Sequence, residues 1–288
     1  MKKVIALLLV AVLATLTFAA CGKKTDDPAN AAQLEVAVPN DPTNEARALL
    51  LLEANGVITL DAAAGIAATV ADITENPYNI KFREVEAAQI PNVLQDVDYG
   101  VINANYALAA NLNPVADALA VEGSASAYGN VLAVHEDNKD ADLTKALVAA
   151  LESKAVADYI TATYNGAVIS VVDNPGDGTD ASVDYAALAG QTITVAASPT
   201  PHAEILAIAK EILAEKDITL DIIEYDDYVQ PNLVVDSGDV YANYFQHVPY
   251  LDNFNTENNT KLVSVAVLHV EPMGIYGGKQ ATLDAVKG

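Results

Sequence analysis

Short apolar segments alternate with amphipathic segments, and this alternation limits the fold more than any other feature of the sequence. LEVAV at 34–38 predicts a strand that ends at Pro39. Apolar residues then recur at helical spacing up to Asn55-Gly56, which predicts a helix that Thr43 or Asn44 would cap. A strand followed by a turn and a helix is half of a parallel α/β unit.

The same order of elements recurs along the chain. Strands are predicted at 79–86, 99–108 (the last part a polar turn), 130–136, 191–198, 218–225 and 240–245, and helices at 87–96, 142–166 and 201–216. The helix at 142–166 would be long and would end at Asn165-Gly166. DNPGDGTDASVD at 173–184 interrupts the pattern and has no apparent packing face. Two α/β series on either side of it indicate two lobes with a cleft between them.

The first twenty residues have the composition of an export signal. A basic MKK start and an apolar stretch lead to Ala19, Ala20 and Cys21, the only cysteine of the 288 residues. We expect cleavage after residue 20 and lipidation of Cys21, followed by a flexible tether at 21–33. A transmembrane helix is the alternative, but the apolar run is shorter than the roughly 20 residues that cross a bilayer.

The formal charge of -24, from 15 basic and 39 acidic residues, argues against nucleic acid as a partner. Binding to phosphates needs clustered Lys and Arg, whereas the acidic residues here are spread along the chain. Solubility explains such a charge, and a specific acidic surface is the alternative.

Several long segments resemble the NlpA/MetQ family of methionine-binding lipoproteins. They include PNDPTNEARALLLLE from Pro39, VINANYAL, YDDYVQPN, YANYFQHVPYLDNFN and HVEPMGIY, and together they span most of 34–288. The resemblance implies an α/β fold of the two-lobed periplasmic-binding type (type II-like), in which each lobe is a mixed sheet flanked by helices.

The order of these segments departs from the family. PHAEIL, which lies near the start in the family, appears at 201–206, whereas PNDPTN, which lies in the second half there, begins at Pro39. We interpret the chain as a circular permutant whose old ends are joined by a linker at 173–189; an artificial or misassembled sequence is the alternative. One lobe would comprise 34–125, with 277–288 returning to it, and the other 126–276. Leu34 and Gly288 should then lie close together.

The resemblance also implies a ligand pocket. Arg47 matches the family arginine that takes the α-carboxylate of the amino acid, and a guanidinium can hold a carboxylate through two parallel bonds. An exposed helical arginine paired with Glu45 or Glu53 is the alternative. Asn103 and Asn130 match family asparagines, and their amides would bond a zwitterion without burying another charge. Each could instead be a turn residue.

Aromatic residues are expected on the opposite wall, at Tyr228, Phe245, His247 and Tyr250. Aromatic rings suit a thioether because they bury its area and make sulfur–aromatic contacts of about 0.3–1.5 kcal/mol. In an extended segment Phe245 and His247 would point to one face. These residues could also belong to an ordinary core.

We expect no metal and no cofactor, because the four histidines are dispersed and none has the spacing of a helical zinc site. His202 is expected to be a cap or surface residue. The sequence also lacks the nucleophile elbow, phosphate loop and dinucleotide motifs of common enzymes, so we expect no catalytic residues.

The function that we expect is therefore delivery of L-methionine, or of D-methionine or a methionyl dipeptide, to an ABC importer permease with its cytoplasmic ATPase. The protein would be a monomer held at the extracytoplasmic face of the cell membrane by its lipid anchor. A surface lipoprotein for adhesion or assembly, with a vestigial pocket, is the alternative.

Overall fold

The computed structural model describes residues 33–123 and 128–286. The predicted signal, Cys21 and nearly all of the predicted tether lie outside these residues, as does Gly288. By its internal contacts the chain divides into Met1–Gln33 and one compact unit, Leu34–Gly288, and the fold below is that of the second unit. Within the described residues, no helix combines the length and the apolar character that crossing a membrane requires.

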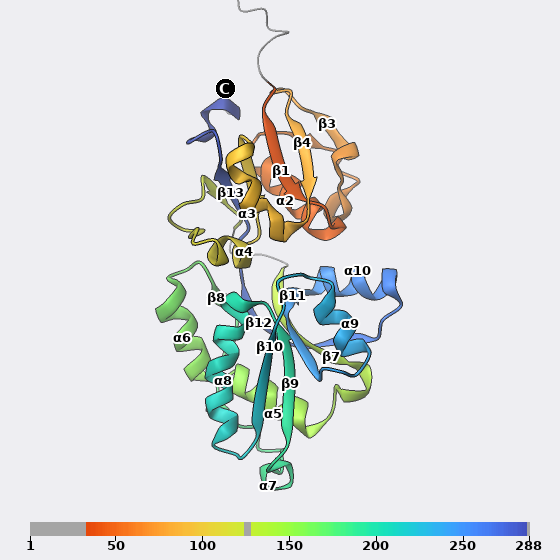
Figure 1. Cartoon of the computed structure of the whole chain (residues 1–288), viewed down its shortest axis with the longest axis vertical. Helices are drawn as coiled ribbons and strands as arrows, with labels where there is room; N and C mark the ends of the chain where they lie inside the picture. Colours follow the sequence, from red (N-terminus) through yellow and green to blue (C-terminus); the bar gives the residue numbers. More distant parts are fainter. Residues whose placement is uncertain (1–32, 124–127, 287–288) are drawn as a thin grey trace, which may run out of the picture. The chain divides into compact units, whose positions relative to one another are not determined.

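Five strands of the described chain form the first sheet, in the order β4-β1-β5-β13-β6 (Figure 1). Strand β1 pairs in parallel with β4 and β5, whereas β13 pairs antiparallel with β5 and β6. The predicted mixed sheet is thus confirmed for this half of the unit. The strands are β1 (Glu35–Pro39), β4 (Lys81–Val85), β5 (Tyr99–Ile102), β6 (Ala120–Val121) and β13 (Gly274–Gly277).

Helix α2 (Pro42–Ala54) follows β1, as predicted, and ends at Asn55. Its N-cap is not Thr43 or Asn44 but Asp41, whose carboxylate accepts from the Asn44 backbone N–H at 3.0 Å. Asp is as good a cap as Asn, and Pro42 suits the first helical position because proline has no N–H to satisfy there. The cap places residues 44 and 47 on the first turns of the helix, directly beyond the end of β1.

Both faces of the first sheet are covered. Val36 and Val38 of β1 pack with Leu49 of α2, whereas Ala37 faces the opposite way and packs with Ile90. Side chains alternate along a strand, so a strand that is buried on both faces reads as a continuous apolar run. On the second face lie α3 (Ile90–Val93) and α4 (Ala104–Ala109).

Six described strands form the second sheet, in the order β10-β9-β11-β7-β12-β8. Strands β10, β9 and β11 run parallel, and β7 pairs antiparallel with β11 and β12. The second predicted mixed sheet is therefore also confirmed. The strands are β7 (Gly129–His135), β8 (Ile169–Ser170), β9 (Thr192–Ala197), β10 (Thr219–Glu224), β11 (Ala242–His247) and β12 (Leu262–Val270).

Helices also cover both faces of the second sheet (Figure 1). Leu132 and Val134 of β7 belong to the larger core, whereas Val131 and Ala133 belong to a second apolar cluster on the other face. The longer helices over the first face are α5 (Asp142–Leu151), α6 (Lys154–Tyr164) and α8 (Glu204–Ala214), and those over the second are α9 (Gln230–Asp236) and α10 (Val248–Asn258).

The long helix predicted at 142–166 is in fact two helices, α5 and α6, with a break at Glu152-Ser153. Ser153 caps α6 by accepting from the Val156 N–H at 3.2 Å. Gly176 hydrogen-bonds to the backbone on each side of the break. Its carbonyl accepts from the Lys154 N–H at 2.8 Å, and its N–H donates to the Glu152 carbonyl at 3.0 Å. A distant segment therefore takes over backbone groups that a continuous helix would have paired internally.

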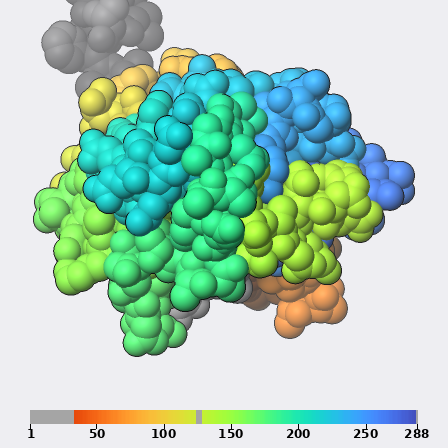
Figure 2. Space-filling view, turned by 90° about the horizontal axis from the view of Figure 1, so that it is seen from below, coloured from red at the N-terminus to blue at the C-terminus, as the bar shows by residue number. Residues whose placement is uncertain are grey.

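The segment 173–184 does have a packing face, contrary to the prediction. Val183 is buried in the main core of the second sheet, and so is Leu188 in the short helix α7 (Tyr185–Leu188) that follows. At Gly178, with φ of +93°, an added Cβ would lie 2.7 Å from Ile212 of α8. In the space-filling view, green residues of this region lie against the teal residues of α8 (Figure 2).

The remaining elements are short. Strands β2 (Thr59–Leu60) and β3 (Ile73–Glu75) form a separate antiparallel pair. The helix predicted at 87–96 is a succession of turns, η4, α3 and η5, and the polar turn predicted after β5 is the helix α4. The helical turns are η2 (Gly65–Ala67), η3 (Val70–Asp72), η4 (Ala87–Gln89), η5 (Leu94–Asp96), η6 (Glu136–Asn138), η7 (Pro199–Ala203) and η8 (Leu283–Val286).

Among the strands of residues 33–123 and 128–286, the chain changes from one large sheet to the other at two places, between β6 and β7 and between β12 and β13. The second crossing brings the chain back to the first sheet at Gly274, slightly before the residue 277 that we expected. Val286 then packs in the same apolar cluster as Val36 and Leu49, and Leu34 packs against that cluster. The two ends of the described unit are thus in one core.

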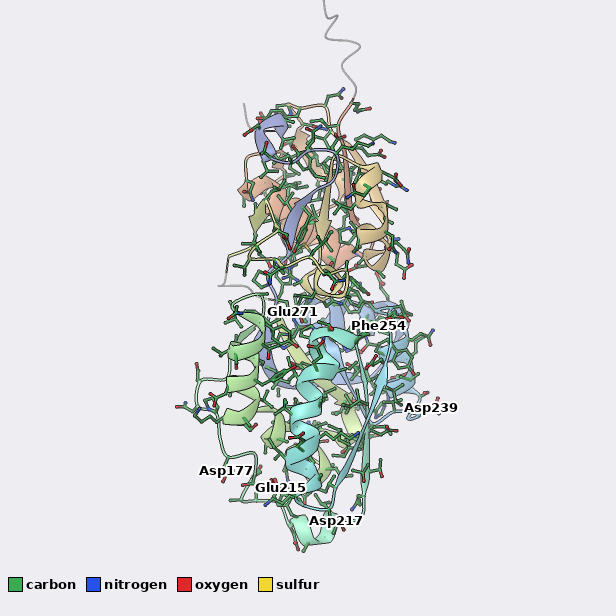
Figure 3. The ribbon with its side chains drawn as sticks, turned by 60° about the vertical axis from the view of Figure 1, so that its left-hand side comes forward. Asp177, Glu215, Asp217, Asp239, Phe254 and Glu271 are labelled. Atoms are coloured by element: carbon green, nitrogen blue, oxygen red, sulfur yellow. The ribbon has the colours of Figure 1, made fainter. Side chains whose placement is uncertain are left out.

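Acidic side chains are mostly at the surface. Asp177, Glu215, Asp217 and Asp239, labelled in Figure 3, are all exposed. Glu271, also labelled there, differs because it is only 5% exposed and lies at the second crossing between the sheets. Because a buried carboxylate needs charged or hydrogen-bonding partners, we expect the functional site around this residue.

Candidate functional site

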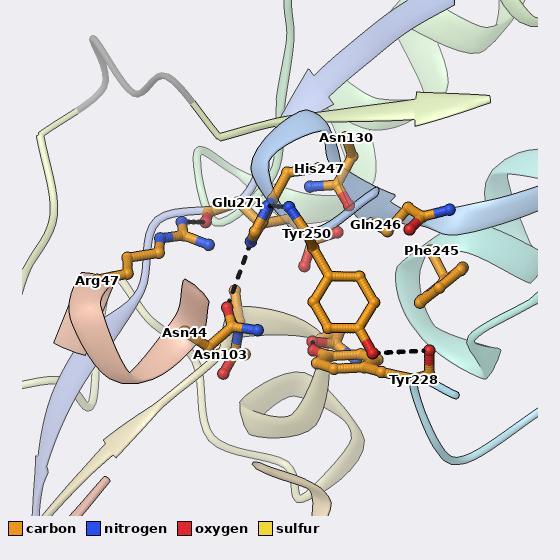
Figure 4. A pocket seen from close by; sticks show the side chains of 12 residues that line it. Asn44, Arg47, Asn103, Asn130, Tyr228, Phe245, Gln246, His247, Tyr250 and Glu271 are labelled. Carbon is orange, nitrogen blue, oxygen red and sulfur yellow. Dashed lines mark hydrogen bonds between the residues drawn. The ribbon is translucent and has the colours of Figure 1, made fainter. Parts of the chain in front are cut away.

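All seven residues that the sequence predicted as ligand-binding line one pocket (Figure 4). Arg47 comes from α2, Asn103 directly follows β5, and Asn130 lies in β7. Asn44 also comes from α2, and the other lining residues come from β11, α10, the residues that follow β5, and the segments before α9 and after β12. The complete lining is Asn44, Arg47, Asn103, Ala104, Asn105, Asn130, Tyr228, Phe245, Gln246, His247, Tyr250 and Glu271.

Arg47 is the cation of the pocket and is only 4% exposed. It does not pair with Glu45 or Glu53, which were its alternative partners. Its Nε and Nη2 donate to the Glu122 carboxylate at 3.0 Å and 2.6 Å, and Nη2 also donates to the Glu271 carbonyl at 2.7 Å. Its guanidinium carbon lies 4.4 Å from the centre of the Tyr128 ring. The charge of this buried arginine is therefore compensated, and its plane is fixed by contacts on several sides.

Asn103 and Asn44 form a pair of amides beside Arg47. Asn103 Nδ2 donates to Asn44 Oδ1 at 2.8 Å, and Asn44 Nδ2 donates to the Asp41 carboxylate at 2.9 Å. Burial raises the pKa of Asp41 even though Asn44 and Thr43 hydrogen-bond to it. Among the described residues, Asn103 Oδ1 is buried and has no hydrogen-bond partner. Because buried acceptors are rarely left unpaired, this oxygen marks a place for a ligand donor.

His247, at the end of β11, hydrogen-bonds to Asn44 of α2 and so joins lining residues from the two halves of the compact unit. Burial, and then the charge of Arg47, hold the pKa of His247 well below its usual value, so the ring is neutral at pH 7. Its Nδ1 accepts from the Tyr250 N–H at 3.2 Å and caps α10, which leaves the proton on Nε2. Nε2 then donates to Asn44 Oδ1 at 3.3 Å. This histidine is a neutral part of the pocket wall.

The aromatic residues form one cluster at the other end of the pocket. Phe245, Tyr250 and Phe254 are buried together, and Tyr228 packs against them with ring centres 5.8 Å from both Phe245 and Tyr250. Tyr228 donates its hydroxyl to Asn105 Oδ1 at 2.6 Å, and Tyr250 donates to the Tyr228 carbonyl at 3.0 Å. Burial raises the pKa of Tyr228 well above its usual value, so its hydroxyl remains a donor.

The strand that carries Phe245 and His247 is not regular. Its pairing with β7 shifts register between Tyr244 and Gln246, which is the signature of a bulge. Gln246 consequently also lines the pocket, although strict alternation would place it on the opposite face from its two neighbours. Its amide is held by hydrogen bonds with Asn232 and Asn243.

Behind the pocket lies a buried group of two histidines and one carboxylate. Glu271 Oε1 is 2.6 Å from His269 Nε2 and 3.2 Å from His202 Nε2, and the latter is also 3.0 Å from Asn130 Oδ1. Tyr244 hydrogen-bonds to His269 Nδ1. The prediction of His202 as a cap or surface residue is wrong, because the residue is only 1% exposed.

The ionisation of this group follows from its burial. Burial lowers the pKa of His202 to about 3, against the attraction of Glu271. Burial alone would raise the pKa of Glu271, but the neighbouring histidines and Arg47 together hold it below its usual value. Glu271 is therefore an anion at neutral pH, and it lines the pocket together with the cationic Arg47.

His202, His269 and Glu271 could also hold a metal ion, since their ligating atoms lie within 4.8 Å of one another. The dispersal of histidines in the sequence gave no sign of this grouping. The same atoms are already engaged in the hydrogen bonds to Glu271 and Asn130, which a metal would have to replace. Hydrogen bonding thus accounts for the arrangement without an ion.

The sequence did not single out several lining residues. Asn44 lies in the same PNDPTN segment that identified Arg47, so its position next to a predicted ligand residue was an available signal. Asn105 lies in the same VINANY segment that identified Asn103, and it also lines the pocket. Glu271 and His202 gave no local signal, because the fold brings them together from positions far apart in the chain.

Known proteins resemble this chain in sequence. It is 44% identical over 146 residues to the membrane lipoprotein TpN32 of Treponema pallidum, covering 51% of this chain and 53% of that protein. It is 43% identical over 137 residues to the D-methionine-binding lipoprotein MetQ of Escherichia coli, covering 47% of this chain and 51% of that protein. The chain spans about half the length of the curated relatives that it matches.

Solved structures show similar partial coverage. A nutrient-binding protein of Burkholderia cenocepacia bound to methionine is 50% identical, covers 50% of this chain and 62% of its own, and gives a TM-score of 0.46. A lipoprotein of Ruminococcus gnavus is 51% identical; the match covers 48% of this chain and 59% of that protein, with a TM-score of 0.47. The model of the NlpA lipoprotein family matches residues 12–172 and 193–288, which is most of the sequence. The chain is therefore a member of the NlpA lipoprotein family.

Proposed function

We propose that this protein is the substrate-binding lipoprotein of an ABC importer and that its pocket binds methionine as a zwitterion. The observation that carries the proposal is the composition of the pocket, which has a cation and an anion at one end, Arg47 and Glu271, and aromatic rings at the other. Relatives with about 43% identity over half the chain bear the name D-methionine-binding lipoprotein.

The polar end fits the charges of an amino acid. Arg47 would bond the α-carboxylate, whereas the unpaired Asn103 Oδ1 and the Glu271 carboxylate would accept from the ammonium group. Asn130, whose Oδ1 is held near His202, would direct its amide toward the ligand. Because the charges of ligand and pocket match, neither is buried without a partner.

The aromatic end fits a thioether side chain. Tyr228, Phe245 and Tyr250 would cover the methionine sulfur and its methylene groups, and His247, being neutral, adds a further ring without an added charge. Burying such a side chain contributes about 1.5–3 kcal/mol. Together with the polar contacts, this suffices for binding in the micromolar range, about -8 kcal/mol.

Mass spectrometry of freshly purified protein under native conditions tests this function. We expect a mass increment equal to one methionine, and L-methionine should raise the melting temperature of protein from which the ligand has been removed. The change Arg47→Ala should abolish that stabilisation. Protein that carries no methionine and does not respond to either enantiomer would contradict the function and favour a role in adhesion or assembly.

We also propose that Cys21 carries the lipid anchor at the extracytoplasmic face of the membrane. The basic start, the apolar run and the small residues before Cys21 support this, as does membership of a lipoprotein family. Fractionation of cells that express the full chain tests it. Wild-type protein should sediment with membranes and Cys21→Ser should not; an unchanged distribution would argue against lipidation at this cysteine.

We further propose that the chain is a circular permutant of its family. The family model matches two segments that are separated at 173–192, close to the predicted linker at 173–189. Leu34 and Val286 contribute to the same apolar cluster, as expected if the chain was opened between them. In the proposed function, the protein acts as a monomer and delivers bound methionine to the permease of the importer, which works with a cytoplasmic ATPase.

A further inference from the structure

The side chain of Arg47 contacts both segments in which the chain passes between the sheets. Its Nε and Nη2 bond to Glu122, directly after β6 in the first crossing, and Nη2 bonds to the Glu271 carbonyl in the second. The Glu122 carboxylate is therefore bound along the edge of the guanidinium that offers two parallel N–H donors. On the edge formed by Nε and Nη2, two parallel bonds of the kind expected for the ligand carboxylate are made to Glu122.

A count of donors shows what remains for a ligand. A guanidinium has five N–H groups, and the bonds to Glu122 and Glu271 use the one on Nε and both on Nη2. Nη1, with two N–H groups, has no partner within residues 33–123 and 128–286. Arg47 lines the pocket, whereas Glu122 does not and instead lines a neighbouring surface depression with Arg47 and Tyr128.

Glu122 is itself held in place. Its Oε2 also accepts from the Met273 backbone N–H at 3.3 Å, so the carboxylate is tied to the second crossing as well as to Arg47. Its side chain is only 17% exposed, and the Tyr128 ring lies against the guanidinium. A charge-assisted pair that is partly buried and doubly bonded has a fixed geometry, unlike an exposed salt bridge.

We propose that Glu122 is a positioning residue that turns Arg47 so that Nη1, and not the edge formed by Nε and Nη2, meets the carboxylate of the ligand. The inference rests on the proposed function. It differs from the alternative in which Glu122 occupies the place of the ligand carboxylate and must be displaced. The two arrangements predict changes of opposite sign when the charge of Glu122 is removed.

Calorimetric titration with L-methionine tests the role in four proteins: wild type, Glu122→Gln, Glu122→Asp and the control Glu211→Gln, which removes an exposed carboxylate from α8. Each is also titrated with methioninol, in which a hydroxymethyl group replaces the carboxylate. We expect Glu122→Gln to weaken methionine binding at least about tenfold, because a charge-assisted contact is misaligned. Glu122→Asp should be intermediate, and Glu211→Gln should match wild type.

The methioninol titrations separate positioning from a general structural role. If Glu122 acts through the orientation of Arg47, the affinity for methioninol should change less than threefold in both Glu122 variants. Equal losses for both ligands, tighter binding of methionine by Glu122→Gln, or no change would each overturn the positioning role. Should Glu122→Gln fail to fold, Glu122→Asp decides between these outcomes. Wild-type protein without methionine binding would overturn the proposed function and, with it, this inference.

Discussion

The Tyr228 hydroxyl donates a 2.6 Å hydrogen bond to Asn105 Oδ1, which connects the aromatic cluster to the helix that follows β5. Asn105 belongs to the first sheet and its helices, and Tyr228 to the second. The Tyr106 ring lies 4.9 Å from that of Tyr228 and adds a second contact between the same two parts. The complete pocket thus depends on contacts between residues of the two sheets.

We therefore expect Tyr228→Phe to weaken methionine binding about fivefold to tenfold, the equivalent of one net hydrogen bond of about 1 kcal/mol. The melting temperature of the ligand-free protein should change little. Titration calorimetry measures the first effect and thermal unfolding the second. Tyr241→Phe is the control, because it removes a hydroxyl that bonds to Thr144, and neither residue lines the pocket. Equal affinities of the two variants would contradict the role of Tyr228.

Asn103 gives a second prediction, because its Oδ1 is a buried acceptor without a partner among the described residues. Asn103→Leu keeps a similar volume but removes this acceptor, and a hydrogen bond to a charged group is worth about 1.5–3 kcal/mol. We expect the dissociation constant for methionine to rise roughly tenfold to hundredfold. Binding of 4-methylthiobutanoate, which lacks the ammonium group, should change much less. A similar loss for both compounds would mean that Asn103 does not face the ammonium group.

A third prediction concerns pH. Burial lowers the pKa of His202 to about 3, so between pH 6.5 and 3 the unfolded chain binds a proton at this residue that the folded protein does not. The effect of His202 on the free energy of unfolding is absent above about pH 6.5. As the pH is lowered the free energy of unfolding falls, by about 2 kcal/mol at pH 5 from this residue alone. The lowered pKa of His247 adds a loss of the same sign.

Urea unfolding at pH 7 and pH 5 measures this dependence. His202→Gln should reduce the difference in unfolding free energy between the two pH values, even though it lowers stability at both. If His202→Gln and wild type lose stability equally, His202 is not the group that takes up the proton.

A fourth prediction follows from the proposed permutation. A reordered chain that begins at Asn174 and runs to Val286, and then continues through a short linker from Leu34 to Asp173, should fold and bind methionine. Its dissociation constant should be within about threefold of wild type, because the packed contacts are retained. Circular dichroism and calorimetry would check this. An unfolded reordered chain would contradict the inferred join and opening.

The sequence predicted the elements that depend on local patterns. The helix after β1 was recognised by its apolar spacing and its Asn55-Gly56 end, and both were confirmed. Its cap was assigned wrongly because Asp41, Thr43 and Asn44 are all good caps, and a pattern cannot choose among neighbours. The break at Ser153 was missed since the apolar spacing continues across it, whereas the hydrogen bonds that stabilise the break come from Gly176.

The pocket was predicted through family resemblance, and the structure brings those seven residues together. What could not be predicted is how their charges are paired. Glu122 is distant from Arg47 in sequence, and neither residue has a local pattern that indicates the other. The burial of His202 likewise depends on β7, β12 and the segment after β9, which only the folded chain brings together.

The packing of Val183 and Leu188 in the main core has a practical consequence for protein engineering. The segment between the two α/β series is not uniformly replaceable: a reporter domain inserted near Val183 would remove apolar contacts, whereas Asp173 and Asn174 are exposed. The bond between these two residues is therefore the better insertion point for a fluorescent sensor. Such a sensor would leave intact the hydrogen bonds of Gly176 that fix the start of α6.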